Sequence, residues 1–198
     1  FMSLPFAVPD KKFARTAKTI EGDEGVHDTD RDKLAKLKPV SPGGTVTYAG
    51  QTHPADGNAA IVVATRERAA ELSRDRNIRI EVLGVGQARA AEKMMPLAPV
   101  PATKAALADA DVSIDRIDAV KSHNPFIVND IVFAKETGYD ADRINNYGCS
   151  LVWGHPHAPT ATRGIVELIE ELVVRGGGYG LFQGCAAGDF GMALVVRV

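Results

Sequence analysis

The sequence of 198 residues predicts a layered α/β domain with a mixed sheet. From residue 45 onward, β-prone runs alternate with helical patterns, and this alternation favours a sheet covered by helices. The last two β-prone runs, residues 179–183 and 190–198, are joined by a short link rich in Gly and Ala, so they predict a terminal hairpin within a mixed sheet. Hydrophobic residues make up 45% and charged residues 24% of the chain, near the averages of soluble globular proteins, which predicts a substantial core.

Residues 1–44 differ from the rest of the chain. Pro and Gly recur through this segment and argue against long regular elements. The stretch 21–38 carries charges of both signs and is typical of an exposed connection. We therefore expect residues 1–44 to form an irregular connecting or wrapping segment, and residues 45–198 to form the domain.

The first elements of the domain are short. Residues 45–48 are β-prone, and residues 57–64 end in an apolar run. Thr65 is a suitable N-cap for a helix through Leu72, because its hydroxyl can accept a backbone N–H of the first turn. Residues 78–86 then alternate apolar positions with Gly and predict a strand.

Three elements follow in the middle of the chain. Pro101 opens a helix rich in Ala and Leu over residues 102–110. Residues 117–122 predict a short strand, and residues 126–137 predict a helix with one apolar face. Gly138 is a typical C-terminal stop for that helix.

The next helix is predicted to begin at Thr160 as its cap and to end at Gly176-Gly177-Gly178. Its apolar face consists of Ile165, Leu168, Ile169 and Leu172. Its solvent-facing side is predicted to hold Glu167, Glu170, Glu171 and Arg175. The element order predicted for the whole domain is βαβαβαββ, with helices on both faces of the sheet.

Composition excludes several classes of function. With 23 Lys and Arg against 25 Asp and Glu, the net charge of −2 gives no general attraction to nucleic acid. No apolar run approaches the roughly 20 residues of a membrane span. The two cysteines, Cys149 and Cys185, do not make a disulfide framework, so we expect a reducing, cytoplasmic compartment.

Cys185 and His155 are the residues most suited to covalent chemistry. Cys185 lies in the Gly- and Ala-rich link, which leaves room for a substrate to approach its sulfur, and the thiolate is the reactive form. His155 precedes Pro156, which favours an extended conformation at the His, and a neutral imidazole there can accept a thiol proton. The alternative interpretations are a small buried hydrophobe for Cys185 and a loop residue bonded to backbone for His155.

His123 and Asn124 lie where a strand is predicted to end and a helix to begin, a common ligand position in α/β folds. Either side chain can donate a hydrogen bond to a developing oxyanion. The alternative is that they cap the following helix. His155 and His157 lie two residues apart without further ligands nearby in the sequence, so we expect no metal site.

These segments, taken in order from about residue 45 to 198, resemble the C-terminal half of the thiolase family, which comprises acetyl-CoA acetyltransferases and 3-ketoacyl-CoA thiolases. His123-Asn124-Pro125-Phe126 is nearest the version of that block in the sterol-carrier type. The five blocks that carry the resemblance are Gly44-Thr45-Val46-Thr47 with Asp56-Gly57, Pro99-x-Pro101-Ala102, Asp118 to Phe126, Gly154-His155-Pro156 and Gly184-Cys185.

The resemblance implies chemistry on acyl-coenzyme A thioesters, by Claisen condensation or thiolysis, with coenzyme A thioester as substrate and no covalently bound cofactor. It implies that His155 activates a nucleophilic Cys, that Cys185 moves the proton of the attacking acetyl group, and that His123 and Asn124 contribute to oxyanion holes. His53 occupies a coenzyme A-contacting position of the family, and Gly188 is expected to border the same substrate.

The resemblance also implies a missing partner. The family's acylated Cys lies in the N-terminal half, and no Cys precedes Cys149 here. We therefore expect the chain to work with an N-terminal half, as a separate chain or as part of a longer polypeptide, in a homo- or hetero-oligomer. A non-catalytic subunit that binds acyl-coenzyme A or supports a partner is the alternative. Half of a related condensing enzyme, such as a ketoacyl synthase, is disfavoured by the combination of His155 with Cys185.

Overall fold

A mixed four-stranded sheet forms the centre of residues 50–198. Its strands are β3 (Glu81–Arg89), β4 (Ala119–His123), β5 (Tyr179–Ala186) and β6 (Phe190–Arg197), in the spatial order β3-β6-β5-β4. β4 and β5 run parallel, whereas β6 runs antiparallel to both β5 and β3. The predicted α/β class, the mixed sheet and the terminal hairpin are confirmed.

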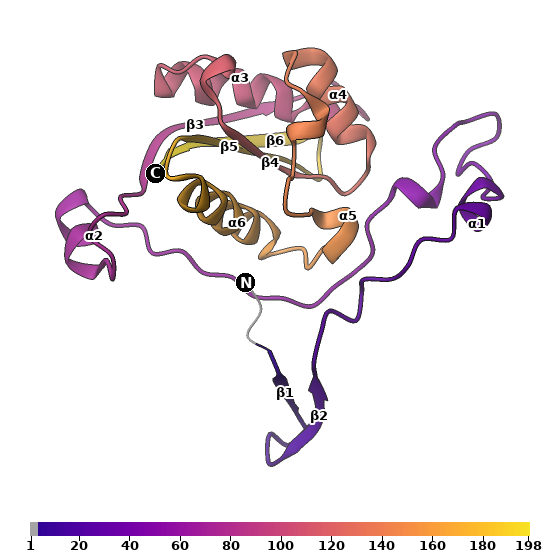
Figure 1. Cartoon of the computed structure of the whole chain (residues 1–198). Helices are drawn as coiled ribbons and strands as arrows, with labels where there is room; N and C mark the ends of the chain where they lie inside the picture. Colours follow the sequence, from indigo (N-terminus) through magenta and orange to yellow (C-terminus); the bar gives the residue numbers. More distant parts are fainter. Residues whose placement is uncertain (1–3) are drawn as a thin grey trace. The chain divides into compact units, whose positions relative to one another are not determined.

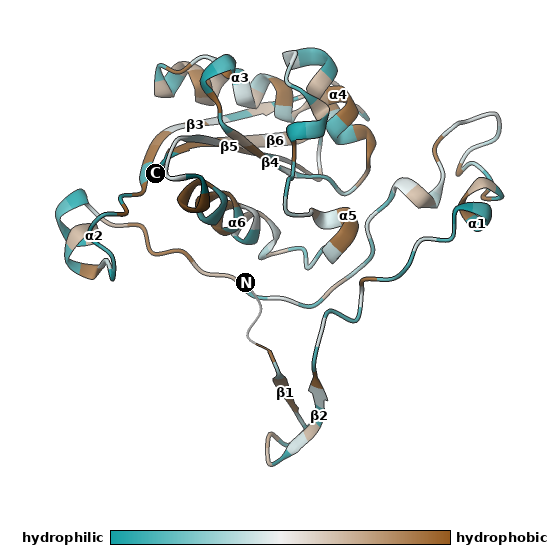
Figure 2. Cartoon of the chain, viewed as in Figure 1, coloured by the Kyte–Doolittle hydropathy of each residue, from teal (hydrophilic) through white to brown (hydrophobic). Residues whose placement is uncertain are grey.

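Helices cover both faces of this sheet, as predicted. α3 (Pro99–Ala110) and α4 (Val128–Thr137) lie on one face, and α6 (Thr160–Arg175) lies on the other (Figure 1). Alternate residues of a strand point to opposite faces. Leu181 of β5 packs in the cluster beneath α3, whereas Phe182 packs in the cluster beneath α6. Figure 2, coloured by the hydropathy of each residue, shows both hydrophobic and hydrophilic stretches on α6, as expected for a helix that packs one side on the sheet.

Glycines bring α3 unusually close to β3. A Cβ added at Gly86 would lie 2.0 Å from Ala102 O, and one added at Gly84 would lie 2.4 Å from Ala106 O. The helix backbone therefore packs directly on the strand backbone, which only glycine permits.

The predicted helix ends are largely confirmed. Thr65 caps α2 (Arg66–Leu72) by accepting the N–H of Arg68 at 3.3 Å. Gly138 and Gly176 adopt left-handed conformations just after α4 and α6, where glycine has no steric penalty.

The predicted solvent exposure of Glu167 and Glu171 is wrong. Glu167 is buried and pairs with Lys121 and, at 3.6 Å, with Arg163; Glu171 is buried and pairs with Arg175 at 2.8 Å. Buried carboxylates require such partners. The sequence pattern of α6 does not show that Lys121 of β4 lies close enough to pair with Glu167. The pattern alone therefore predicts that Glu167 faces solvent.

Two β-prone runs do not form strands. Residues 45–48 lead into a 3-10 turn, η1 (Tyr48–Gly50). Residues 57–64 are extended but belong to neither sheet, and Val62 and Val63 are 79% and 84% exposed. A strand needs the backbone N–H and C=O groups of a neighbour, and the four-stranded sheet offers none to this segment.

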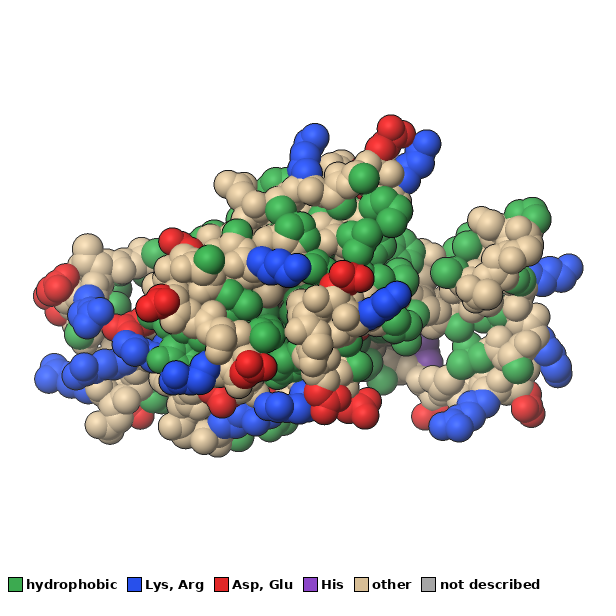
Figure 3. All heavy atoms as spheres, turned by 90° about the horizontal axis from the view of Figure 1, so that it is seen from above, with side chains coloured by type: hydrophobic (Ala, Val, Ile, Leu, Met, Phe, Trp, Pro, Cys, Tyr) green, Lys and Arg blue, Asp and Glu red, His purple; other side chains and the backbone are tan. Residues whose placement is uncertain are grey.

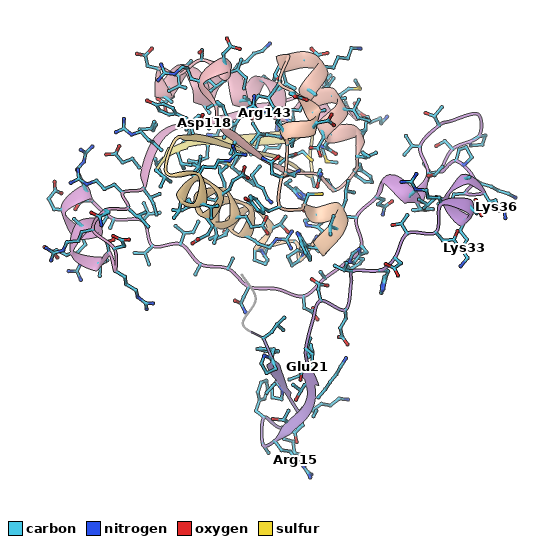
Figure 4. The ribbon with its side chains drawn as sticks, in the orientation of Figure 1. Arg15, Glu21, Lys33, Lys36, Asp118 and Arg143 are labelled. Carbon is cyan, nitrogen blue, oxygen red and sulfur yellow. The ribbon has the colours of Figure 1, made fainter. Side chains whose placement is uncertain are left out.

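The structure is a computed structural model that describes residues 4–198, and residues 1–49 form a unit separate from residues 50–198. β1 (Phe6–Pro9) and β2 (Thr16–Ile20) form an antiparallel hairpin that the sequence does not predict, with Arg15 near its tip (Figure 4). The remaining short helices are α1 (Arg31–Ala35), η2 (Met95–Leu97), η3 (Ile114–Arg116), η4 (Ala141–Arg143) and α5 (Ser150–Trp153). Across residues 4–198, no helix combines the length and apolar character that crossing a bilayer requires.

Candidate active site

The predicted site residues gather at the carboxyl ends of the two parallel strands. His123 is the last residue of β4 and pairs with Gly184 of β5, so Cys185 lies one residue beyond that level. Asn124 directly follows His123. The carboxyl edge of parallel strands is a common place for functional side chains, because loops can there be shaped without disturbing the sheet.

His123 is buried and is held by a residue far away in the sequence. One ring nitrogen, Nδ1, lies 3.1 Å from the hydroxyl of Ser150, the first residue of α5. The ring centroids of His123 and His155 are 4.5 Å apart, with the rings tilted by 37°. The fold thus brings two of the predicted residues into direct contact.

His155 is fixed by both its backbone and its ring. Its N–H donates to His53 O at 2.8 Å, and it forms an isolated parallel bridge with Pro54, which confirms the predicted extended conformation. Its Nδ1 lies 2.8 Å from Thr160 Oγ1. Thr160 is the first residue of α6 rather than its cap, so its hydroxyl is available to the imidazole. With Nδ1 engaged, Nε2 is the nitrogen free to exchange a proton.

Burial keeps both imidazoles in the neutral form. It lowers the pKa of His123 to about 4, and the neighbouring His155 contributes to this shift. Burial also lowers the pKa of His155, together with the charges of His157, whose ring centroid is 4.2 Å away, and Arg163. A neutral His155 can accept a proton near pH 7. Within residues 4–198, no three His, Cys, Asp or Glu residues are grouped to hold a metal ion.

Cys185 is buried at the end of β5, and its closest polar partner is on α4. Asn129 Nδ2 donates to Cys185 Sγ at 3.3 Å. Burial raises the pKa of the Cys185 thiol, and the Asn129 hydrogen bond opposes this by favouring the thiolate. In the described part of the chain, no hydrogen bond joins Cys185 to a histidine.

Asn124 belongs to a polar cluster under α4. Its Nδ2 donates to Asp130 Oδ2 at 2.5 Å. Burial raises the pKa of Asp130. The alternative that His123 or Asn124 caps α4 is wrong. The residue at the N-cap position is Ile127, and it makes no side-chain capping hydrogen bond.

Comparison with known proteins decides the family. Residues 77–198 match the family model described as the thiolase C-terminal domain. The chain belongs to the thiolase family. It is 32% identical over 196 residues to an acetyl-CoA acetyltransferase of Chromobacterium violaceum, a match that covers 98% of this chain and 49% of that thiolase. The chain therefore spans about half the length of the relatives it matches.

Solved thiolase structures share the fold. The Bacillus anthracis acetyl-CoA acetyltransferase superposes with a TM-score of 0.82 at 29% identity, covering 91% of this chain and 46% of that one. A human mitochondrial 3-ketoacyl-CoA thiolase crystallised in complex with CoA superposes with a TM-score of 0.78 at 26% identity, over 91% of this chain and 46% of that one.

The two residues predicted to border coenzyme A occupy different environments. His53 is half-buried beside Gly154, and its carbonyl holds the His155 backbone. Gly188 lies in the exposed turn between β5 and β6 with φ +87°, and a Cβ built there would be 3.9 Å from Arg89 Nη2. The turn begins two residues after Cys185, and the assignment of both residues to coenzyme A stays a prediction.

Sequence reasoning misses four residues of the candidate site: Ser150, Thr160 as a ring partner, Asn129 and Arg163 as a hydrogen-bond donor. Each is a common polar residue on a helix, and each acts on a residue from another element. Arg163 Nη2, for example, donates to Gly154 O at 3.2 Å. Only its position after the Gly-His-Pro block singles it out in the sequence.

Proposed function

We propose that this chain is the catalytic C-terminal half of a thiolase-type acyltransferase that acts on acyl-coenzyme A thioesters. The observation that carries the proposal is the contact between His123 and His155 at the strand edge where Cys185 lies. The relatives, named as acetyl-CoA acetyltransferases and 3-ketoacyl-CoA thiolases, support the substrate class. The His-Asn-Pro-Phe block favours the sterol-carrier type within the family.

In the first step His155 serves the N-terminal half. Nε2 of His155 accepts the proton of that half's Cys thiol, and the thiolate attacks the thioester carbonyl carbon. The carbon–sulfur bond to coenzyme A breaks, coenzyme A leaves with the proton as a free thiol, and the acyl group stays on the Cys. Thr160 supports this role because it engages Nδ1 and so leaves Nε2 free.

In the second step Cys185, as thiolate, removes a proton from the methyl group of acetyl-coenzyme A. The resulting carbanion attacks the acyl carbon, a carbon–carbon bond forms as the acyl–sulfur bond breaks, and the Cys of the N-terminal half leaves as a thiolate. That thiolate takes the proton from Cys185 and restores the Cys185 thiolate. Thiolysis is the reverse. His123, neutral because its pKa lies at about 4, and Asn124 donate hydrogen bonds to the developing oxyanions. Cys185 needs a base before it acts, because burial raises its pKa.

We propose that the N-terminal half covers the open part of the sheet. α6 packs on β4 and β5, and on the same face Val85 of β3 and Met192 of β6 are 48% and 46% exposed. Burial of such apolar side chains favours association.

A non-catalytic role is the second candidate. It is favoured by the burial of Cys185, which raises the pKa of its thiol and so favours a protonated sulfur. In that case the chain would bind acyl-coenzyme A or stabilise a partner without transferring an acyl group.

The test is to produce the chain together with an N-terminal thiolase half and to assay thiolysis of a 3-ketoacyl-coenzyme A. We expect activity from the mixture, none from either half alone, and its loss in His155→Ala and Cys185→Ala. His27→Ala, a change of the same type at an exposed residue, is the matched control. Activity that survives both site substitutions would refute the catalytic assignment. An inactive mixture that still binds acyl-coenzyme A would favour the second candidate.

A further inference from the structure

Two cationic side chains bind the two ends of residues 148–154, the segment that contains Ser150 and directly precedes His155. Lys121 Nζ donates to Gly148 O at 2.6 Å, and Arg163 Nη2 donates to Gly154 O at 3.2 Å. Lys121 comes from β4 and Arg163 from α6, so the sheet and the helix each hold one end of residues 148–154.

Glu167 joins the two cations. Its carboxylate pairs with Lys121 and, at 3.6 Å, with Arg163 Nε. The side chains of Lys121 and Glu167 are only 4% and 6% exposed, and that of Arg163 is 22% exposed. A charge buried to this degree is costly without its partner, so each member of the trio depends on the others.

Both ends of the segment are glycines, whose backbone has the most conformational freedom to lose, so contacts that fix them matter. Gly148 has φ +100° and Gly154 has φ +81°, which other residues rarely adopt. Between them Ser150 contacts His123 Nδ1, and His155 follows directly after Gly154. The orientation of the Gly154 peptide therefore sets the starting point of the His155 side chain.

We propose that Lys121, Glu167 and Arg163 are positioning residues that hold the 148–154 segment and, through it, the His123–His155 contact. The importance of this contact for catalysis rests on the proposed function. The clamp, by which we mean Lys121, Glu167 and Arg163 bound to the 148–154 segment, can be tested without any assay of activity.

Arg163 also acts on His155 through its charge. The ionisable groups around His155 are His123 from β4, His157 from the same loop, Arg163 from α6, and His53. The carbonyl of His53 accepts the backbone N–H of His155. The Arg163 charge lowers the pKa of His155. Removing the cation should therefore raise this pKa, and removing the Glu167 anion should lower it, because a charged imidazole is disfavoured by net positive charge. A purely structural role does not predict opposite signs.

The experiment is NMR on the 198-residue chain, combining amide hydrogen exchange with titration of the His155 ring. Lys121→Met should speed exchange of the Gly148 amide, and Arg163→Met that of the Gly154 and His155 amides, by about tenfold or more relative to the sheet. Arg163→Met should raise the His155 pKa, and Glu167→Gln should lower it. Arg175→Met is the matched control, because Arg175 pairs with buried Glu171 on the same helix and does not contact the segment.

Unchanged local exchange with an unchanged His155 pKa in all three variants, as in the control, would overturn the proposal. If a single substitution prevents folding, Lys121→Met/Glu167→Met removes both buried charges and keeps apolar volume, and it should still speed exchange at Gly148. Protection at Gly148 that stays at the control value in this double variant would also overturn it. Because neither readout needs the N-terminal half, failure of the clamp is distinguishable from failure of the proposed function.

Discussion

The rings of His123 and His155 lie 4.5 Å apart between centroids, although one ends a buried strand and the other lies in a loop before α6. Neither ring is free to turn independently, because Ser150 engages His123 and Thr160 engages His155. The charged trio of Lys121, Glu167 and Arg163 binds the two ends of the 148–154 segment, whereas charged side chains of both signs are spread over the surface in Figure 3.

The stability of the chain should fall in acid because His123 is buried in the neutral form. Its pKa is about 4 in the folded chain, against 6.5 unfolded, so the unfolded chain binds more protons as the pH falls from 6.5 to 4. The loss should reach about 3 kcal/mol of the free energy of unfolding at pH 4. His123→Asn should remove this share, as measured by urea unfolding at pH 7 and pH 4. Equal losses in both proteins would contradict the assignment.

Thr160 should matter for the reaction because its hydroxyl contacts the His155 ring. Thr160→Val keeps the shape of the side chain but removes the partner of His155 Nδ1, and we expect acyl transfer to slow by about 10- to 100-fold in the reconstituted enzyme. Thr160→Ser keeps the hydroxyl and should stay near the parent rate. In the parent enzyme the acid side of the pH–rate profile should lie at a lower pH than for an ordinary histidine, because the pKa of His155 is lowered. Equal rates for the Val and Ser variants would exclude this role.

Asn129 should tune the thiol of Cys185. Asn129→Leu removes the hydrogen bond that favours the thiolate, so the pKa of Cys185 should rise further. The measurement is the pH dependence of alkylation at Cys185, followed by mass spectrometry, with half-buried Cys149 of the same chain as an internal control. A pH profile that does not move, or moves to lower pH, would contradict the assigned contact.

Gly86 should be among the least replaceable positions of the fold. A Cβ there would lie 2.0 Å from Ala102 O and 2.5 Å from Ala106 N, so Gly86→Ala must push α3 away from β3. We expect a loss of about 2 to 4 kcal/mol in the free energy of unfolding. Gly22→Ala, where nothing lies within 4 Å, should be nearly neutral in the same denaturation assay. Similar stabilities for the two variants would argue against this packing.

The sequence predicts those elements whose signals are local. Thr65, Gly138 and Gly176 end or begin helices through their own backbone and side-chain chemistry, and the structure places them there. Residues 57–64 show the limit of this reasoning. Their apolar pattern is typical of a strand, but a strand also needs a neighbour, and the four-stranded sheet does not include them.

The site was predictable only in part for the same reason. His123 and His155 carry their own chemistry and are found from motif and position. Their partners Ser150 and Thr160 are ordinary hydroxyl residues whose roles arise from contacts between elements. The burial of Glu167 depends on Lys121 of β4, which the periodicity of α6 cannot show.

The central claim is that His155 and Cys185 serve two different proton transfers, and separating the half-reactions tests it most directly. The chain is combined with an N-terminal half, and two rates are measured: transfer of labelled acetyl from acetyl-coenzyme A to the protein, and exchange of the acetyl methyl protons for deuterium. His155→Ala should slow labelling by about 100-fold or more, whereas Cys185→Ala should label normally and lose the deuterium exchange. Normal labelling in His155→Ala, or persistent exchange in Cys185→Ala, would contradict the account.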